Sequence, residues 1–188
     1  MSDPLASLLE RYVALHQAAR GTLPRQPYEP DWPSPCQVGP PDAAGWIAWR
    51  PVRRKPPADF SGLERALEAP LHPNLAAYFG RFWSDVVPGR TAEGGVSLIQ
   101  IWNEQDFERL IENLLGHALA KARARAPLTL FFATTDEDER FLSVDNASGR
   151  VLLEIPGEPP VREVAPDLDA FLARVEPVLS SPEGADEG

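Results

Sequence analysis

Apolar residues recur at helical spacing in three segments of the chain. In residues 4–20 they form one stripe, and Gly21 is expected to end that helix. The longest stripe covers residues 103–125, where Asn103 is a favourable N-cap and Pro127 forbids continuation. A third stripe follows Asp167 and extends to Leu179. We therefore predict a helix near each end of the chain and a core helix between them.

Short runs of apolar and β-branched residues predict strands in the remaining segments. They lie at residues 46–49, 96–102, 128–134, 141–144 and 151–155, with a further short strand at 161–164. The last of these runs are separated by few residues, among them the turn-forming residues 146–149, as is typical of hairpins. This order predicts an α+β domain, in which helices pack on one face of a mainly antiparallel sheet of about five to six strands.

Proline shapes the region between the first helix and the core helix. Residues 24–57 contain ten prolines, which lack an N–H and fix φ, so this segment is expected to be extended loop. The strand at residues 46–49 interrupts it once, at an edge or terminal position. Residues 60–69 and 74–83 predict two short helices, and residues 89–95 a turn. One domain is expected over residues 1–179, followed by a disordered acidic tail at residues 180–188.

Charge is distributed unevenly along the chain. Residues 1–90 carry ten basic and nine acidic side chains, whereas residues 91–188 carry eight and nineteen, a net charge of −11. Such acidity argues against binding to nucleic acid or anionic lipid. The longest segment without charge, residues 69–80, is too short to span a membrane, and the first residues lack the pattern of a secretion signal. A cytoplasmic protein is expected, with any membrane association made through another protein.

The sequence contains no motif typical of catalysis or of a cofactor site. One cysteine, Cys36, and three histidines do not have the spacing of metal ligands. The segment from Asp136 to Arg140 begins like a calcium loop but lacks its later ligand and glycine, and Gly94-Gly95 lacks the context of a phosphate loop. We therefore expect no enzyme activity, no metal and no cofactor.

Several short strings resemble one known family. They are Ser34-Pro35-Cys36, Leu98-x-Gln100-x-Trp102, Asp106-Phe107, Glu112-Asn113-Leu114-x-Gly116-His117, Pro127-x-Thr129-Leu130-Phe131-x-Ala133-Thr134 and Ser143-Val144-x-Asn146-x-Ser148-Gly149-x-Val151. With Phe171-Leu172 and Pro177-x-Leu179, these strings resemble the SecY-interacting Syd family of bacteria, part of the SUKH-like superfamily. The similarity is weak over residues 21–90, where this chain has additional prolines and the basic cluster Arg53-Arg54-Lys55.

The resemblance implies both a function and a binding surface. Family members are peripheral proteins on the cytoplasmic side of the inner membrane, and they present an acidic concave surface to basic cytosolic loops of SecY, the translocase channel subunit. They are thought to monitor or regulate translocase assembly. Cytoplasmic loops of membrane proteins are rich in Lys and Arg, which makes such a target complementary to this chain. The residues implied in docking are Asp85, Glu104, Asp106, Glu112, Asp136, Glu137, Asp138 and Glu139.

Two other functions remain as alternatives. An acidic groove would equally suit an immunity protein that masks the basic active site of a toxin, because the superfamily contains such proteins. An acyl-transfer enzyme would need Cys36 as a nucleophile with a histidine as its base. The sequence does not show whether the acidic residues converge or whether the proline-rich segment folds against them. The oligomeric state is likewise undetermined, with a monomer favoured.

Overall fold

The described residues form five helices and twelve mostly short strands. A computed structural model describes residues 3–137 and 139–179. Its helices are α1 (Pro4–Arg20), α2 (Ser61–Leu67), α3 (Pro73–Gly80), α4 (Glu104–Arg123) and α5 (Leu168–Leu172). Its strands are β1 (Arg25–Pro27), β2 (Gln37–Val38), β3 (Trp46–Trp49), β4 (Val52–Arg53), β5 (Phe82–Trp83), β6 (Val87–Thr91), β7 (Gly94–Leu98), β8 (Thr129–Thr135), β9 (Phe141–Asp145), β10 (Val151–Glu154), β11 (Arg162–Ala165) and β12 (Glu176–Pro177).

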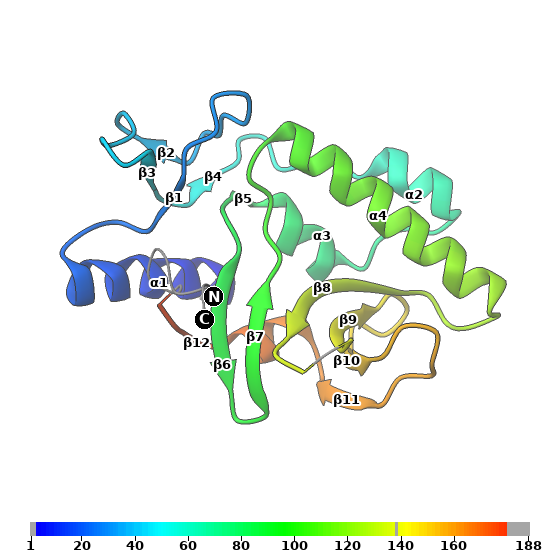
Figure 1. The fold of residues 1–188 in the computed structure, drawn as a ribbon. Coiled ribbons are helices and arrows are strands. Elements are labelled where there is room, and N and C mark those ends of the chain that lie inside the picture. Colours follow the sequence, from blue (N-terminus) through cyan, green and yellow to red (C-terminus); the bar gives the residue numbers. More distant parts are fainter. Residues whose placement is uncertain (1–2, 138, 180–188) are drawn as a thin grey trace.

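A curled sheet of seven strands forms the centre of the molecule (Figure 1). Its strand order is β11-β10-β9-β8-β7-β6-β12, and every neighbouring pair is antiparallel. Two smaller sheets flank it, one of order β1-β3-β2 and one formed by β4 and β5. The α+β class is confirmed, and the main sheet has one strand more than the five to six expected from the sequence.

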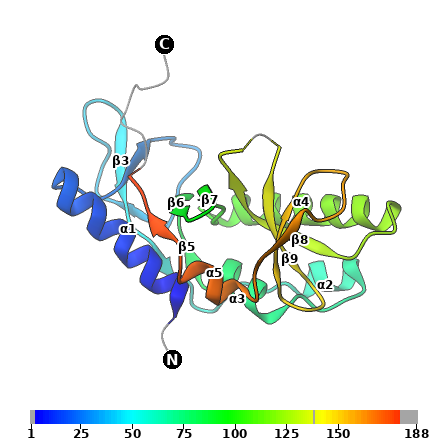
Figure 2. The same ribbon diagram turned by 90° about the horizontal axis from the view of Figure 1, so that it is seen from below.

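Helices contact both sides of the central strand β8, whereas the sequence predicted helices on one face of the sheet. The His117 ring of α4 lies 5.6 Å from the Phe131 ring, whereas the next residue, Phe132, lies 5.5 Å from Tyr78 of α3 and 5.5 Å from Phe171 of α5. The register of β8 shifts between Phe131 and Ala133, so strict alternation does not apply there, but Figure 2 shows α4 across β8 from α3 and α5. In Figure 2, α1, α3 and α5 lie along the lower side of the molecule, whereas β3 lies at its upper side.

Local sequence signals explain where the two longest helices begin and end. At α1, Asp3 accepts a hydrogen bond from the Ala6 N–H at 3.1 Å, and Gly21 adopts the left-handed conformation that ends the helix. At α4, Asn103 caps the first turn, acidic residues occupy that turn, and Lys121 and Arg123 lie in the last one. Both helices therefore match the prediction from apolar spacing.

The prediction for the proline-rich segment was incomplete. Residues 24–57 contain four short strands rather than one, and β3 is the central strand of its small sheet rather than an edge. Proline avoids the middle of β3 but ends β1 at Pro27, where a missing N–H is tolerated. Trp49 of β3 is only 1% exposed, so this segment carries part of the hydrophobic core.

Three other boundaries were predicted wrongly. Residues 82–83 form strand β5 rather than the end of a helix, and most of residues 89–95 belongs to the β6–β7 hairpin rather than to a turn. The last helix ends at Leu172, after which β12 pairs with β6 through Glu176 and Arg90. Residues 180–188, predicted as a disordered tail, lie outside the described residues.

Candidate docking surface

The proline-rich segment packs on the start of α4. Trp102 donates its indole N–H to the Trp32 carbonyl at 3.2 Å, and Ser34 donates its hydroxyl to the Trp102 carbonyl at 2.5 Å. Asn103 adds an amide hydrogen bond to the Pro33 carbonyl at 2.9 Å. The rings of Trp49 and Trp102 meet edge to face at 6.0 Å. These contacts join two segments that are distant in the sequence, namely the two strings that contain Ser34 and Trp102.

Asp106 stabilises the helix as well as carrying charge. The Asn103 side chain accepts a hydrogen bond from the Asp106 N–H at 2.9 Å, and the Asp106 carboxylate accepts one from the Trp102 N–H at 2.9 Å. This reciprocal arrangement is a capping box extended by one residue, and it satisfies N–H groups at the helix start. Arg109, one turn later, lies 3.5 Å from the other carboxylate oxygen. Part of the Asp106 carboxylate is therefore used to stabilise the start of α4.

Glu104 lies beside a buried arginine. The Arg54 guanidinium packs 3.6 Å from the centre of the Trp83 ring and 5.1 Å from that of Phe107, and its side chain is 7% exposed. Burial lowers the pKa of Arg54, and the negative charge of Glu104 opposes that change. The Arg54–Glu104 distance is 3.4 Å, while the Glu104 side chain remains 70% exposed. Glu104 thus balances Arg54 and still faces solvent.

Asp85 is the predicted site residue with the most perturbed ionisation. It is half-buried just before β6, and its carboxylate accepts a hydrogen bond from the Val86 N–H at 2.7 Å. Burial raises the pKa of Asp85 to about 6; the Val86 hydrogen bond opposes this rise, and the negative charge of Asp106 adds to it. Within the described chain, Asp85 has no ion pair with Lys or Arg. The neighbouring Val86 is 44% exposed, so this carboxylate lies beside apolar surface.

The acidic turn between β8 and β9 lies against the β6–β7 hairpin. The Asp136 carboxylate accepts a hydrogen bond from the Gly95 N–H at 2.9 Å, and Glu137 forms an ion pair with Arg140. A Cβ atom at Gly95 would lie only 2.9 Å from the Asp136 carboxylate oxygen, so a larger residue there would displace this carboxylate. Glu139 is exposed and has a positive φ of 64°. Asp138 lies outside the described residues.

The structure brings some of these residues together and separates others. Asp106 is close enough to Asp85 for its negative charge to help raise the pKa of Asp85, and Glu104 lies in the same helical turn as Asp106. Glu112 is exposed on α4, and it lies about 12 Å from Glu104 along the helix axis. The acidic turn and the helix start lie at opposite ends of β7, because Asp136 contacts Gly95 near the first residue of this strand, whereas Trp102 follows its last residue, Leu98.

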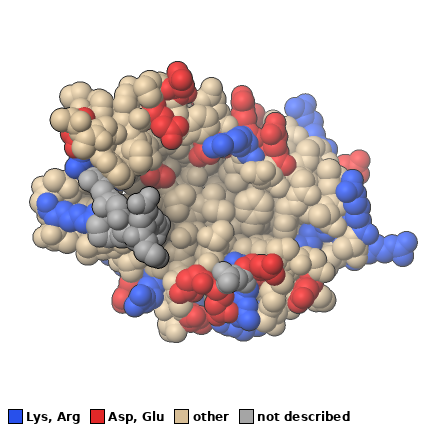
Figure 3. Space-filling model, in the orientation of Figure 1, with Lys and Arg blue, Asp and Glu red and all other residues tan. Residues whose placement is uncertain are grey.

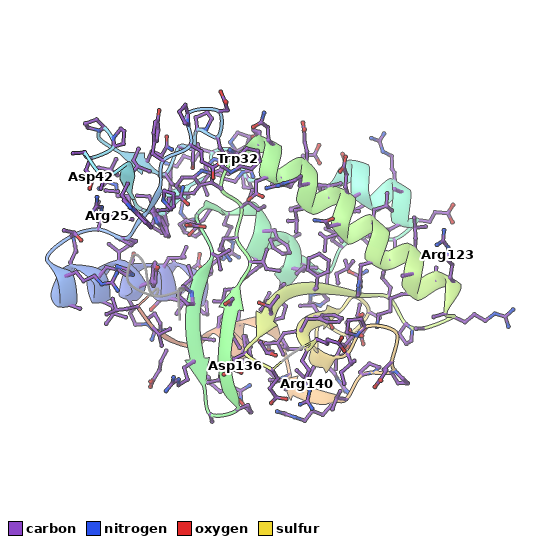
Figure 4. The ribbon with its side chains drawn as sticks, in the orientation of Figure 1. Arg25, Trp32, Asp42, Arg123, Asp136 and Arg140 are labelled. Atoms are coloured by element: carbon purple, nitrogen blue, oxygen red, sulfur yellow. The ribbon has the colours of Figure 1, made fainter. Side chains whose placement is uncertain are left out.

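Two views show this separation directly. In Figure 4, Trp32 lies above β7, near the start of α4, whereas Asp136 and Arg140 lie beside the lower half of β7. In Figure 3, acidic side chains lie along the upper and lower margins of the same face, with some basic side chains among them and mostly uncharged surface between the two margins. Basic side chains gather at the right-hand end of this view.

The remaining candidates for chemistry have little support. Cys36 is completely buried, and burial raises the pKa of its thiol to about 12, so it is poorly suited to act as a nucleophile. Within residues 3–137 and 139–179, no group of His, Cys, Asp and Glu side chains could hold a metal ion. None of the described helices is long and apolar enough to cross a membrane.

Reasoning from sequence missed several residues around the surface. Trp83 and Arg54 form the support under Glu104, yet Arg54 was noticed only as part of a basic cluster and Trp83 only as the end of a helix. Glu93 is at the tip of the β6–β7 hairpin. Together with Asp136 it lines a small pocket at the end of the curled sheet. The two-residue turn of that hairpin is Ala92-Glu93, and the proline and glycines in its strands hide the strand pattern in the sequence.

The fold and surface together define an α+β protein with a curled antiparallel sheet and carboxylates on two margins of one face. The chain belongs to the Syd family, since the sequence profile described as "Syd protein (SUKH-2)" matches residues 2–177. A curated relative named Protein Syd from Pseudoalteromonas atlantica is 45% identical over 155 residues, which is 81% of this chain and 83% of the relative.

Other relatives extend the match over nearly the whole chain. Protein Syd of Hahella chejuensis is 39% identical, with 94% of this chain and 93% of the relative covered. Protein Syd of Aeromonas hydrophila is 41% identical, with 94% and 98% covered. The similarity therefore includes the proline-rich region, where the sequence strings alone gave only a weak resemblance.

Proposed function

We propose that this protein docks onto the basic cytosolic loops of SecY and thereby monitors or regulates assembly of the translocase. It would act as a peripheral protein on the cytoplasmic face of the inner membrane, held there by its protein partner. Membership of the Syd family and the net charge of −10 support this proposal. No catalytic step is included, and the binding energy comes from charge complementarity and apolar contact.

The observation that carries the proposal is the position of Asp85. Burial and the nearby carboxylate of Asp106 make the ionised form of Asp85 unfavourable in the isolated protein, which raises its pKa. A Lys or Arg from a partner would remove the cost by pairing with Asp85 and Asp106 together. Strongly perturbed groups of this kind are concentrated at functional sites.

The exposed carboxylates add smaller contributions. Ion pairs at a protein surface are worth about 0.2–1 kcal/mol each and are screened by salt over about 8–10 Å. Glu104, Glu112 and the acidic turn would therefore raise the association rate and set orientation more than they would increase affinity. Two acidic margins could hold two basic segments, or the two ends of one loop.

Retention of SecY from detergent-solubilised membranes tests the proposal at low and moderate salt. The variants are Glu104→Lys, Asp85→Asn and a turn variant with residues 136–139 changed to Lys. Asp106 is left unchanged because its loss would disrupt the start of α4. Glu10→Lys is the matched control, as Glu10 is exposed on α1 and lies in neither acidic margin.

We expect wild type and Glu10→Lys to retain SecY at low salt, and the other three variants to retain several-fold less. Equal retention by all variants, or by wild type at all salt concentrations, would remove the electrostatic basis of the proposal. Protection of cells against a co-expressed toxin, without retention of SecY, would instead support the immunity alternative.

A further inference from the structure

A pocket opens at the end of the curled sheet, between the β6–β7 hairpin, the β8–β9 turn and β11. Its volume is about 100 Å³. The floor is apolar and consists of Val96, Leu142, Leu153, Val164 and Phe171, of which all but Val164 are buried. These side chains come from four different strands and α5, so the pocket is the open end of the interior of the sheet.

The size of the pocket fits one branched aliphatic side chain. An apolar cavity of about 150 Å³ is enough to bind benzene, and about 100 Å³ corresponds to three or four carbon atoms. None of the described side chains of the protein fills this space. Val161 at its rim is 46% exposed, which extends the apolar surface outward from the floor.

One side of the pocket rim carries negatively charged side chains. Asp136 is held there by the Gly95 N–H at 2.9 Å, and Glu93 lines the pocket next to it. Neither carboxylate has an ion pair with Lys or Arg in the described chain, whereas the charge of Arg140 is compensated by Glu137. Arg162 lines the opposite side of the rim, on β11. A ligand that places a cation on the β7 side and an apolar group inside would match both properties.

We propose that this pocket binds a single aliphatic side chain of a partner polypeptide, flanked by a lysine or arginine that pairs with Asp136 and Glu93. The inference rests on the proposed function, because it assigns to the acidic turn an anchor pocket for the same class of basic loop. It adds a sequence requirement that charge alone does not impose, namely an apolar residue within the basic segment. Occupation of the pocket would bury apolar surface and supply affinity that is insensitive to salt.

Capped tripeptides test the pocket without any partner protein. Acetyl-Lys-Leu-Lys-amide is titrated into methyl-labelled protein, and the Val161, Val164 and Leu153 methyl signals are followed by NMR. We expect these signals to shift saturably and the serine analogue, Lys-Ser-Lys, to bind about tenfold more weakly, since it lacks the apolar group. The acidic analogue, Glu-Leu-Glu, is expected not to saturate them. Equal binding of the leucine and serine peptides would overturn the proposal.

Two variants locate the binding within the pocket. Val164→Phe fills the floor, and Val161→Lys places a cation at the rim on an exposed residue, where folding is not at risk. Each is expected to weaken binding of the leucine peptide about fivefold or more. Val38→Lys is the matched control, because Val38 is also an exposed valine but belongs to β2. A loss in the control as large as that in Val161→Lys would show that the site is elsewhere.

Retention of SecY separates failure of this inference from failure of the proposed function. If wild type and Val161→Lys retain SecY equally, docking occurs without the pocket and the inference is wrong while the function stands. If the leucine peptide binds in the pocket but wild type does not retain SecY, the proposed partner is wrong and the pocket is confirmed as a site for apolar-basic peptides.

Discussion

Replacement of Asp85 by asparagine is expected to stabilise the protein at neutral pH and to weaken its hold on a basic partner. Asparagine has nearly the same shape and can still accept the hydrogen bond from the Val86 N–H, which is 2.7 Å long in wild type. It cannot carry the negative charge that burial and Asp106 make unfavourable. The substitution therefore removes a charge with little change in packing.

The size of the effect follows from the raised pKa. The pKa of Asp85 rises from its ordinary value of 3.8 to about 6 in the folded protein, and each pKa unit corresponds to about 1.4 kcal/mol. Between these two pH values the folded state binds a proton that the unfolded state lacks, so stability falls as pH rises through this window. Asp85→Asn should thus gain about 2 to 3 kcal/mol at pH 7.5, about half of that at pH 5, and little near pH 4.

Urea unfolding of wild type and Asp85→Asn at pH 7.5, 5 and 4 measures these differences. Glu108→Gln is the control, since Glu108 is an exposed carboxylate on α4 outside the predicted docking set, and its stability should follow wild type. SecY retention by Asp85→Asn should fall at pH 7.5, and that of wild type should fall as pH is lowered towards 5.5. A stability gain that does not depend on pH, or no gain at pH 7.5, would refute the reasoning.

Three further predictions concern the hydrogen bond between Ser34 and Trp102, the ion pair between Lys121 and Glu154, and the buried thiol of Cys36. Ser34→Ala removes the hydroxyl bonded to Trp102 and is expected to cost about 2 kcal/mol in urea unfolding and to weaken SecY retention, although it changes no charge. Lys121→Met leaves Glu154, which is completely buried, without its ion-pair partner and should cost about 3 kcal/mol, with much of the loss restored by adding Glu154→Gln. Cys36 should react with a thiol reagent only as fast as the protein unfolds, because its side chain is buried and burial raises its pKa to about 12.

Elements with local signals could be predicted from the sequence. The start of α4 depends on Asn103 and Asp106, which are three residues apart, and its length follows from apolar spacing that ends before Pro127. The strands β8, β9 and β10 are joined by short turns, so each finds its partner close by in the chain. Such elements can be predicted because most of the residues that stabilise them lie close by in the sequence.

Elements that depend on distant partners could not be predicted. Strand β12 has only two residues and forms because Glu176 pairs with Arg90, 86 positions earlier. Gly89, which suggested a turn, is required for close packing instead, since a Cβ there would lie 2.5 Å from a methyl group of Val175. The strands β1 and β2 of the proline-rich segment are similarly short. They form because they pair with β3, and neither is long enough to show an alternation of apolar and polar residues.

The same distinction applies to the candidate site. Glu104 and Asp106 were identifiable as acidic residues of the first helical turn, but not their contacts with Arg54 and Trp102. The position of Asp85 near Asp106 depends on the folding of two segments about 20 residues apart. Family resemblance identified Asp85, whereas composition alone gave no reason to prefer it over other carboxylates.

The energetics of these carboxylates indicate which of them matters most for binding. Asp106 is stabilised by the N–H of Trp102, Glu104 by Arg54, and Asp136 by the N–H of Gly95, so each of these charges already has a favourable contact in the free protein. Asp85 also accepts an N–H, but burial and Asp106 outweigh that contact and leave its ionised form destabilised. A new cation therefore gains most at Asp85, because there it relieves an existing cost as well as adding an attraction. Per charge removed, Asp85→Asn should consequently weaken SecY retention more than neutralisation of any single residue in the acidic turn.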